Sequence, residues 1–386
     1  MVTRLEINRE KALVMALLLG YAGNSAAVLE EFSPYVAARV LHDTNVFRTS
    51  DNEEDDTIGY LGAGLRSAYK ISRQRLLFDG VVERAMYEES DELDHTRIDA
   101  TGTWAWEVGN QWSGDLGYQY NRELSSFEQQ LVREKDMRTT QTGFFQAGYQ
   151  LHPDWRLLAG LNYEDVSYQD RERLDRDRTG FLIDVLYSNT RNSEVGLRAE
   201  YAKNDLQDID AGGGVIIDND YDQYTVSALL NYEVTGKSSL EARAGYTDLR
   251  YDDLDDRDFQ GFDGRLTYKW SVTGKTNIDF VAYQETSSLN NEVASYVLTR
   301  GISIEPRWSV TRKITLVGQV SFENDDFKGN NEIRQQLGLE KRDDDIWRYR
   351  VAANWAPIRQ LKLSLGFRRQ DRDSSIDVRD SNNKSS

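Results

Sequence analysis

Charged residues of opposite sign recur two positions apart in this sequence, and their side chains offer the most scope for chemistry. The pairs are Arg97 with Asp99, Glu241 with Arg243, Asp263 with Arg265, and Glu305 with Arg307. Residues two apart point to the same side of an extended strand, so each pair predicts a charged patch on one face of a sheet. Further basic positions on that face are Arg66, Lys70, Arg156, Arg198, Arg348, Arg350, Lys362 and Arg368, of which we take the arginines at 66, 156, 198, 348 and 350 as candidate site residues.

Two interpretations of these charges are open, and they are compatible. The charges can form cross-strand ion pairs on a wet wall, as any wide barrel requires. They can also bind or pass a polar, hydroxyl-rich solute. We therefore take the four pairs and these five arginines as candidates for lining a pore and contacting a substrate.

Residues suited to catalysis are scarce. The three histidines are His42, His95 and His152, and no nucleophile elbow, zinc-ligand spacing or phosphate-binding loop accompanies them. The sequence therefore predicts no enzyme, no metal and no cofactor.

Acidic runs at 51–56, 252–256 and 343–345 offer oxygen ligands of the kind that Ca²⁺ prefers, but none has EF-hand spacing. Asp218-Asn219-Asp220 is too short to count as such a run. We interpret the acidic runs as solvated external loops, which would repel polyanions.

The elements that carry the charges are long strands. From Ile98 to Val108 every second residue is apolar or small, and the residues between them are mostly polar. After the turn 109–111 the alternation resumes with Trp112, Gly114 and Leu116. Strands of about ten residues with one oily face have the length that a tilted strand needs to cross a bilayer.

This pattern repeats along residues 34–370 and predicts about 17 antiparallel strands in a transmembrane up-and-down β-barrel. Short turns alternate with long acidic loops, which places the short turns in the periplasm. Most Trp residues, such as Trp155 and Trp270, lie near short turns, and tyrosines such as Tyr163 and Tyr246 lie near long loops. A soluble β-sandwich, the alternative fold, predicts no such sorting of aromatic residues.

The predicted number of strands is odd, whereas bacterial barrels usually have an even number of strands. We therefore expect an 18-stranded design with a closing strand missing from this chain. Residues 381–386 are predicted to be a polar loop with no returning strand. A long loop, 203–220 or 324–344, could fold inward as a gate. The motif Val-Thr-Gly/Arg-Lys begins at Val234, Val272 and Val310, and predicts recurrent turn chemistry in hairpins 38 residues apart.

Composition agrees with export to the outer membrane. Residues 1–27 read as a secretory signal peptide, because an apolar run at 12–22 follows Arg4, Arg9 and Lys11 and ends in small residues. The barrel domain is then 28–386, exported through the periplasm.

The formal net charge of −18 disfavours nucleic acid as a partner. The mean hydropathy of −0.67 excludes helical membrane spans only.

The segment Asp43-Thr44-Asn45-Val46-Phe47-Arg48 resembles the DxN-(L/V)-(F/Y)-R stretch near the mature N-terminus of the EpsL-type outer-membrane β-barrel family. That family is associated with exopolysaccharide biosynthesis, and the resemblance implies a component of polysaccharide export or assembly. It carries over no catalytic residues.

We therefore predict an outer-membrane conduit for a polar sugar polymer. Its expected partners are outer-membrane lipid, polysaccharide and periplasmic polysaccharide-export components. The alternatives are a general diffusion porin for small solutes and a plugged structural or adhesive barrel.

Overall fold

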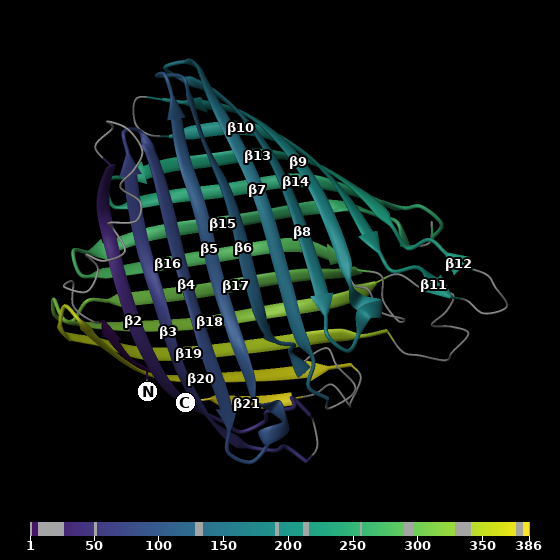
Figure 1. The fold of residues 1–386 in the computed structure, drawn as a ribbon. Helices are drawn as coiled ribbons and strands as arrows, with labels where there is room; N and C mark the ends of the chain where they lie inside the picture. The colour runs from purple at the N-terminus through teal and green to yellow at the C-terminus, as the bar shows by residue number, and fades with distance from the viewer. Residues whose placement is uncertain are drawn as a thin grey trace.

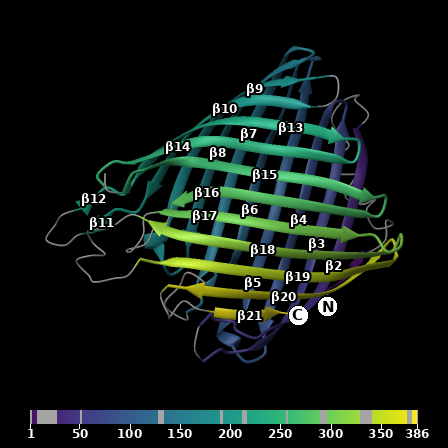
Figure 2. The ribbon, with the colours of Figure 1, turned by 180° about the vertical axis from the view of Figure 1, so that it is seen from behind.

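The structure is a computed structural model, and it describes residues 2–6, 27–49, 52–127, 134–189, 193–210, 216–254, 257–288, 296–328, 341–375 and 381–385. Within them the backbone forms one large antiparallel sheet that closes into a barrel (Figures 1 and 2). In Figure 1 the strands of the near wall cross those of the far wall steeply, as strands tilted to the barrel axis do. No helix among the described residues is long and apolar enough to cross a membrane.

The sheet of the described residues has 19 strands, of which β1 (Val2–Glu6) and β21 (Ser381–Ser385) have five residues each. The other seventeen have 13 to 17 residues, which confirms the predicted strand number. They are β2 (Ala27–Asp43), β3 (Asp56–Ile71), β4 (Gln74–Tyr87), β5 (His95–Val108), β6 (Trp112–Leu124), β7 (Met137–His152), β8 (Trp155–Tyr168), β9 (Arg176–Ser188), β10 (Glu194–Leu206), β13 (Tyr221–Thr235), β14 (Ser238–Tyr251), β15 (Phe259–Thr273), β16 (Thr276–Ser288), β17 (Tyr296–Trp308), β18 (Ile314–Lys328), β19 (Asp343–Ile358) and β20 (Leu361–Ser374).

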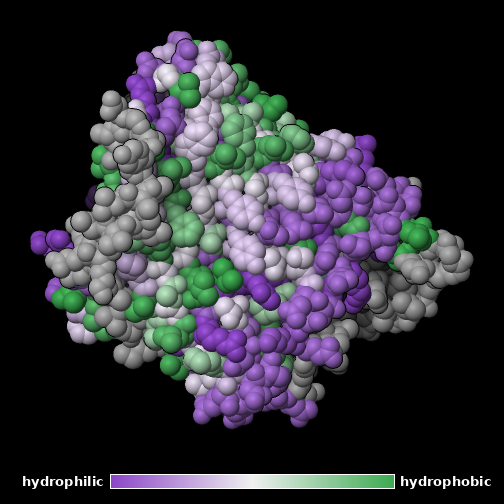
Figure 3. Space-filling view, in the orientation of Figure 1, coloured by the Kyte–Doolittle hydropathy of each residue, from purple (hydrophilic) through white to green (hydrophobic). Residues whose placement is uncertain are grey.

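The apolar side chains point outward rather than into a core. On β10 and β19, for example, Leu197 and Val351 are 64% and 63% exposed. Trp155, Trp270 and Tyr246 are also exposed and lie toward the ends that the sequence predicts. Figure 3 shows apolar and aromatic residues across the wall that faces the viewer, with hydrophilic residues gathered at one end. The predicted alternation of faces is therefore confirmed.

The two ends of the barrel differ, as predicted. At one end, which we call the short-turn end, the strands are joined by short connections such as Ser72-Arg73 between β3 and β4. The other, the long-loop end, carries among its described residues the 3₁₀ turns η2 (Asp91–Leu93) and η4 (Glu172–Leu174), and the small hairpin of β11 (Ile209–Asp210) and β12 (Ile216–Ile217). That hairpin extends away from the barrel in both views, so the described part of loop 203–220 does not fold into the lumen. In the other proposed gate, residues 329–340 lie outside the described residues.

The repeated motif makes one recurrent contact, which lies in two-residue turns after Thr235 and Thr273 and in the longer connection 309–313. The backbone N–H groups of Lys237, Lys275 and Lys313 each donate to the hydroxyl of the threonine two residues earlier, at 3.1 Å in every case. A threonine hydroxyl that satisfies a turn N–H in this way stabilises a tight hairpin. The predicted recurrent turn chemistry is confirmed.

The barrel closes at a seam between β20 and β2. Two short segments occupy this position, each antiparallel to β20. At the short-turn end β1 pairs with both β20 and β2, and at the long-loop end β21 pairs with β20 and, through Ser385, with Asp43 of β2. The seam therefore holds an eighteenth strand position made of two pieces.

Both described end segments of the chain lie in this seam. Residues 381–385 return as β21 instead of forming a loop, because the free edge of β20 offers backbone groups that polar residues can pair with as well as apolar ones. Val2–Glu6 lie in the seam although they belong to the predicted signal peptide, whose apolar run falls outside the described residues. Removal of residues 1–27 stays a prediction.

Candidate functional site

The candidate residues lie on the inner face of the barrel wall. On β15 Asp263 and Arg265 alternate with Phe262 and Leu266, whose side chains are exposed on the outer face. Since successive side chains of a strand point to opposite faces, Asp263 and Arg265 point into the lumen. The same alternation places the other candidates there.

One cluster of luminal charges spans three neighbouring strands. Arg243 of β14 pairs with Asp263 of β15 at 3.0 Å and with Glu285 of β16 at 3.3 Å. Arg265 of β15 donates two hydrogen bonds to Glu285, of 3.0 and 2.8 Å. Glu285 thus accepts from two guanidinium groups that stand opposite each other on adjacent strands. Bidentate contacts of this kind fix the side chains against the wall.

A second cluster continues the line across the next strands. Tyr283 of β16 donates a hydrogen bond of 2.5 Å to Glu323 of β18, and Arg348 of β19 donates to Glu323 at 2.9 Å and to Gln370 of β20 at 3.0 Å. The guanidinium carbon of Arg265 lies 4.5 Å from the centre of the Tyr283 ring and joins the clusters. We call these residues the luminal belt, which consists of Arg243, Asp263, Arg265, Tyr283, Glu285, Glu323, Arg348 and Gln370.

The other candidates take charged or amide partners from other strands. Arg198 forms a bidentate pair with Asp184, with both contacts at 2.7 Å. The remaining contacts are Arg66 with Asp79, Arg97 with Glu123, Asp99 with Asn121, Arg156 with Glu194, Glu241 with Lys269, and Glu305 with Gln319. Facing residues on adjacent strands are closer than residues two apart on one strand, which explains the preference.

Arg307 and Arg350 have no ion pair with any residue that the structure describes, and both are exposed to the lumen. The alternation in the sequence identified the candidates but not their partners. Asp184, Glu285 and Glu323 were missed because a partner depends on the register between strands, which a single strand does not encode.

Two hollows in the inner wall contain candidates. A pocket of about 240 Å³ includes two residues of the luminal belt and is lined from five strands, β9, β10, β13, β14 and β15, which contribute Arg178, Glu200, Thr225, Arg243 and Asp263 respectively. A second pocket of about 280 Å³ lies toward the short turns and includes Arg75, Asp115 and Arg156. Both offer guanidinium donors and carboxylate acceptors, which suit hydroxyl-bearing solutes.

The segment 43–48 folds into a compact loop at the long-loop end. Arg48 donates to both carboxylate oxygens of Asp43, at 3.0 and 2.8 Å, while the Asn45 amide bonds to the backbone of Thr49. Val46 and Phe47 are buried against Leu93 and Phe127 of two neighbouring loops. These six residues therefore hold loops together and do not line the lumen.

Part of the acidic runs is buried, so the prediction that they are solvated loops is wrong at two positions. Asp56 and Asp344 are 2% and 0% exposed. Asp56 accepts hydrogen bonds from the backbone of Glu88 and Ser90, and Asp344 pairs with Arg342. Backbone N–H groups bind the Asp56 carboxylate and a guanidinium binds that of Asp344. These donors take the place of water, so both carboxylates can be buried. Residues 51 and 255–256 lie outside the described part.

The long-loop end also carries a repeat that the sequence analysis missed. The backbone N–H groups of Tyr87, Tyr168 and Tyr251 each donate to the carboxylate of the aspartate seven residues later, at 2.8, 2.7 and 2.9 Å. The acceptors are Asp94, Asp175 and Asp258. The Tyr-x₆-Asp spacing is visible in the sequence and would have predicted three equivalent loop caps.

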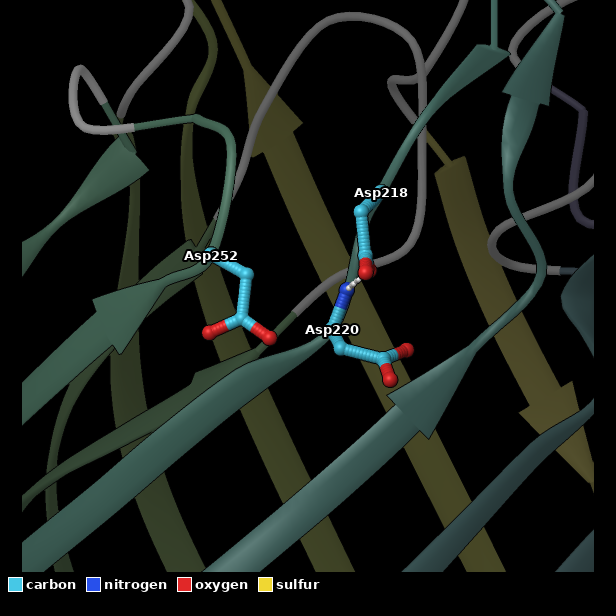
Figure 4. Close-up of side chains that lie close together, drawn as sticks. All are labelled: Asp218, Asp220 and Asp252. Atoms are coloured by element: carbon cyan, nitrogen blue, oxygen red, sulfur yellow. Dashed lines mark hydrogen bonds between the residues drawn. The ribbon is translucent and has the colours of Figure 1, made fainter.

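Three aspartates from two loops meet at this end, as Figure 4 shows. Carboxylate oxygens of Asp218, Asp220 and Asp252 lie within 4.8 Å of one another, and Asp220 already accepts the backbone N–H of Leu206 at 2.8 Å. Burial, and then hydrogen bonding with Asp205, raises the pKa of Asp220, while burial and the nearby charge of Asp218 raise the pKa of Asp252. The cluster therefore combines two aspartates of Asp218-Asn219-Asp220, the segment judged too short to bind a cation, with Asp252 of the acidic run 252–256.

The histidines have ordinary surroundings. His95 is buried and its Nδ1 lies 2.9 Å from the carbonyl oxygen of Leu93, while His42 contacts Thr57 and His152 contacts Asp154. These contacts are those of structural side chains.

Solved porins share this fold. The crystal structure of OpdK from Pseudomonas aeruginosa with vanillate has a TM-score of 0.50 at 14% identity, with 92% of this chain and 97% of that chain covered. A BenF-like porin from Pseudomonas fluorescens Pf-5 has a TM-score of 0.51 at 10% identity, covering 92% and 97%. OccK2 (OpdF) from Pseudomonas aeruginosa has a TM-score of 0.51 at 13% identity, covering 93% and 96%.

At these identities the likeness concerns the fold. Among curated proteins no sequence matches this chain. A family model does match, over residues 32–385, and its description is "Putative beta-barrel porin 2". Since that match spans nearly all of the barrel described above, the chain belongs to this family of β-barrel porins.

Proposed function

We propose that the protein is an outer-membrane porin through which small hydrophilic solutes diffuse. The observation that carries the proposal is the luminal belt, in which three guanidinium groups and three carboxylates between β14 and β19 pair with one another. A wall of this kind is wetted by both donors and acceptors, so a polar solute can exchange its hydrogen bonds with water for bonds with the wall.

The pairing of charges in the belt supports diffusion with little charge selection. Arg243, Arg265 and Arg348 each lie against a carboxylate, so neither sign dominates this part of the lumen. A pore specific for anions or cations concentrates one sign of charge along its path. The acidic loops at the entrance are expected to disfavour large polyanions.

The orientation follows from the two ends of the barrel. Porins have short periplasmic turns and longer external loops, so we place the short-turn end in the periplasm and the long-loop end outside the cell. The exposed apolar side chains of the outer wall then face lipid.

Swelling of liposomes that contain the purified protein tests this proposal. We expect uptake of small sugars at rates that fall smoothly with solute size, and similar rates for a neutral sugar and for glucuronate, the ligand in a crystal structure of OccK2 (OpdF). Protein-free liposomes are the control. Liposomes that do not swell with any small solute would contradict the proposal.

A conduit for exopolysaccharide is the competing proposal, together with its partners, a sugar polymer and periplasmic export components. It rests on the resemblance of residues 43–48, which the structure places in loop packing. Block of the pore by a sugar polymer, and loss of polymer secretion on deletion of this chain alone, would favour it. A plugged structural barrel would give no conductance at all.

A further inference from the structure

The outer wall has an apolar groove at its long-loop half. Its volume is about 650 Å³, within the ~300–1,000 Å³ typical of ligand pockets. The floor is made by small outward-facing residues on three adjacent strands, Ala244 of β14, Gly264 of β15 and Ala282 of β16. The larger side chains of Phe262, Ile302 and Phe322 stand around it.

A cation stands at the rim of this groove. Arg300 of β17 lines it and faces outward, two residues before the exposed Ile302. Its Nε donates to the amide oxygen of Gln284 at 2.9 Å. Among the described residues no carboxylate lies within ion-pair distance of Arg300, although its outer end is exposed.

Several other outward cations at the same end have a carboxylate partner, which Arg300 lacks among the described residues. Lys203, Arg250 and Arg369 each pair with an aspartate two residues away, at 2.7, 2.5 and 2.7 Å. Their charges are therefore compensated within the wall. Arg300 has only the neutral amide of Gln284 as its partner among the described residues, so its guanidinium can form an ion pair with a ligand.

We propose that this groove binds a phosphate-bearing lipid of the outer leaflet, with an acyl chain against Ala244, Gly264 and Ala282 and the phosphate on Arg300. A guanidinium binds phosphate through two parallel hydrogen bonds, and basic sites beside apolar walls recognise anionic head groups in membranes. The groove opens on the wall that faces lipid, and its charged rim lies toward the long loops, where head groups are. The inference is independent of what passes through the lumen.

Native mass spectrometry of the purified barrel in detergent, with bisphosphorylated lipid A as the probe, tests the proposal. We expect wild-type protein to retain one lipid A, and Arg300→Gln to lower its occupancy by about tenfold. Ala282→Phe fills the groove without a change of charge and should lower occupancy as well. Arg250→Gln, a paired cation on the same wall, is the matched control and should bind as wild type does.

Heat-dependent migration on a gel shows that each variant has folded. Equal lipid A binding by wild type and Arg300→Gln would overturn the proposal, as would equal binding of dephosphorylated lipid A. Displacement of the lipid by inorganic phosphate would indicate a site for free anions instead. A dimer of the wild type that Ala282→Phe disrupts would indicate that a second copy covers the groove.

Discussion

Tyr283 crosses a whole strand to reach Glu323. The two residues lie on β16 and β18, and their hydrogen bond of 2.5 Å passes over Gly301 of the intervening β17. A Cβ atom at Gly301 would stand 2.3 Å from Cζ of Tyr283, so the contact exists only because this residue is glycine. The luminal belt is continuous because of this one position.

Gly301→Ala should therefore destabilise the barrel by about 1–3 kcal/mol, since the added methyl group displaces the ring and breaks its bond to Glu323. Urea unfolding of the reconstituted protein measures the change. Gly102→Ala is the matched control, because a Cβ there meets nothing within 4 Å. Equal loss of stability in both variants would show that the contact of Tyr283 with Glu323 contributes nothing.

The pair of Arg198 with Asp184 should be a strong internal contact of the wall. The Asp184 side chain is 3% exposed, so Asp184→Ala leaves a guanidinium without its partner and should cost about 3–5 kcal/mol. The double variant Asp184→Arg with Arg198→Asp should regain much of this loss. If the exchange of charges recovers nothing, the ion pair is not what stabilises these strands.

The facing of the strands predicts opposite results for two neighbouring residues of β19. Val351→Arg places a charge on the outer wall in mid-strand and should impair assembly in a bilayer by about 2–4 kcal/mol. Arg350→Gln changes the inner face and should assemble normally. Folding yield into vesicles measures both, and similar damage would contradict the assigned faces.

The cluster of Asp218, Asp220 and Asp252 should make its loop sensitive to pH. The raised pKa values of Asp220 and Asp252 mean that the folded loop binds protons more tightly than the unfolded chain. The loop is therefore most stable below the ordinary aspartate pKa and loses stability as pH rises through the raised values. Asp252→Asn should increase the hydrogen-exchange protection of the Leu206 amide at pH 7, and this gain should vanish near pH 4. A gain that does not change with pH would show that repulsion between carboxylates is not the cause.

The sequence predicts the barrel well because one physical rule applies to every strand. A residue such as Leu197 faces lipid and its neighbour Arg198 faces the lumen, and this alternation can be read without knowing which strands pair. The turns at Lys237, Lys275 and Lys313 could also be predicted, because threonine and the residues after it determine them locally.

The partners of the charged residues could not be predicted in this way. Glu285 accepts from Arg243 two strands away, and Tyr283 reaches Glu323 across Gly301; both contacts depend on register and on side-chain reach. At the long-loop end, Asp56 and Asp344 look like solvated loop residues in sequence but are buried, because backbone N–H groups of the next long loop bind Asp56 and the Arg342 guanidinium binds Asp344. Segment 381–385 forms a strand for a similar reason, since the edge of β20 pairs with it irrespective of side chains.

The ion selectivity of single pores in planar bilayers tests the central claim most directly. We predict a steady conductance for the wild type with a reversal potential near zero in a salt gradient, because the belt pairs both signs of charge. Arg265→Gln with Arg348→Gln leaves carboxylates of the belt uncompensated and should shift the reversal potential toward cation selectivity, while Arg250→Gln on the outer wall should not. A silent barrel, or a reversal potential that the belt variants leave unchanged, would contradict an open lumen lined by these residues.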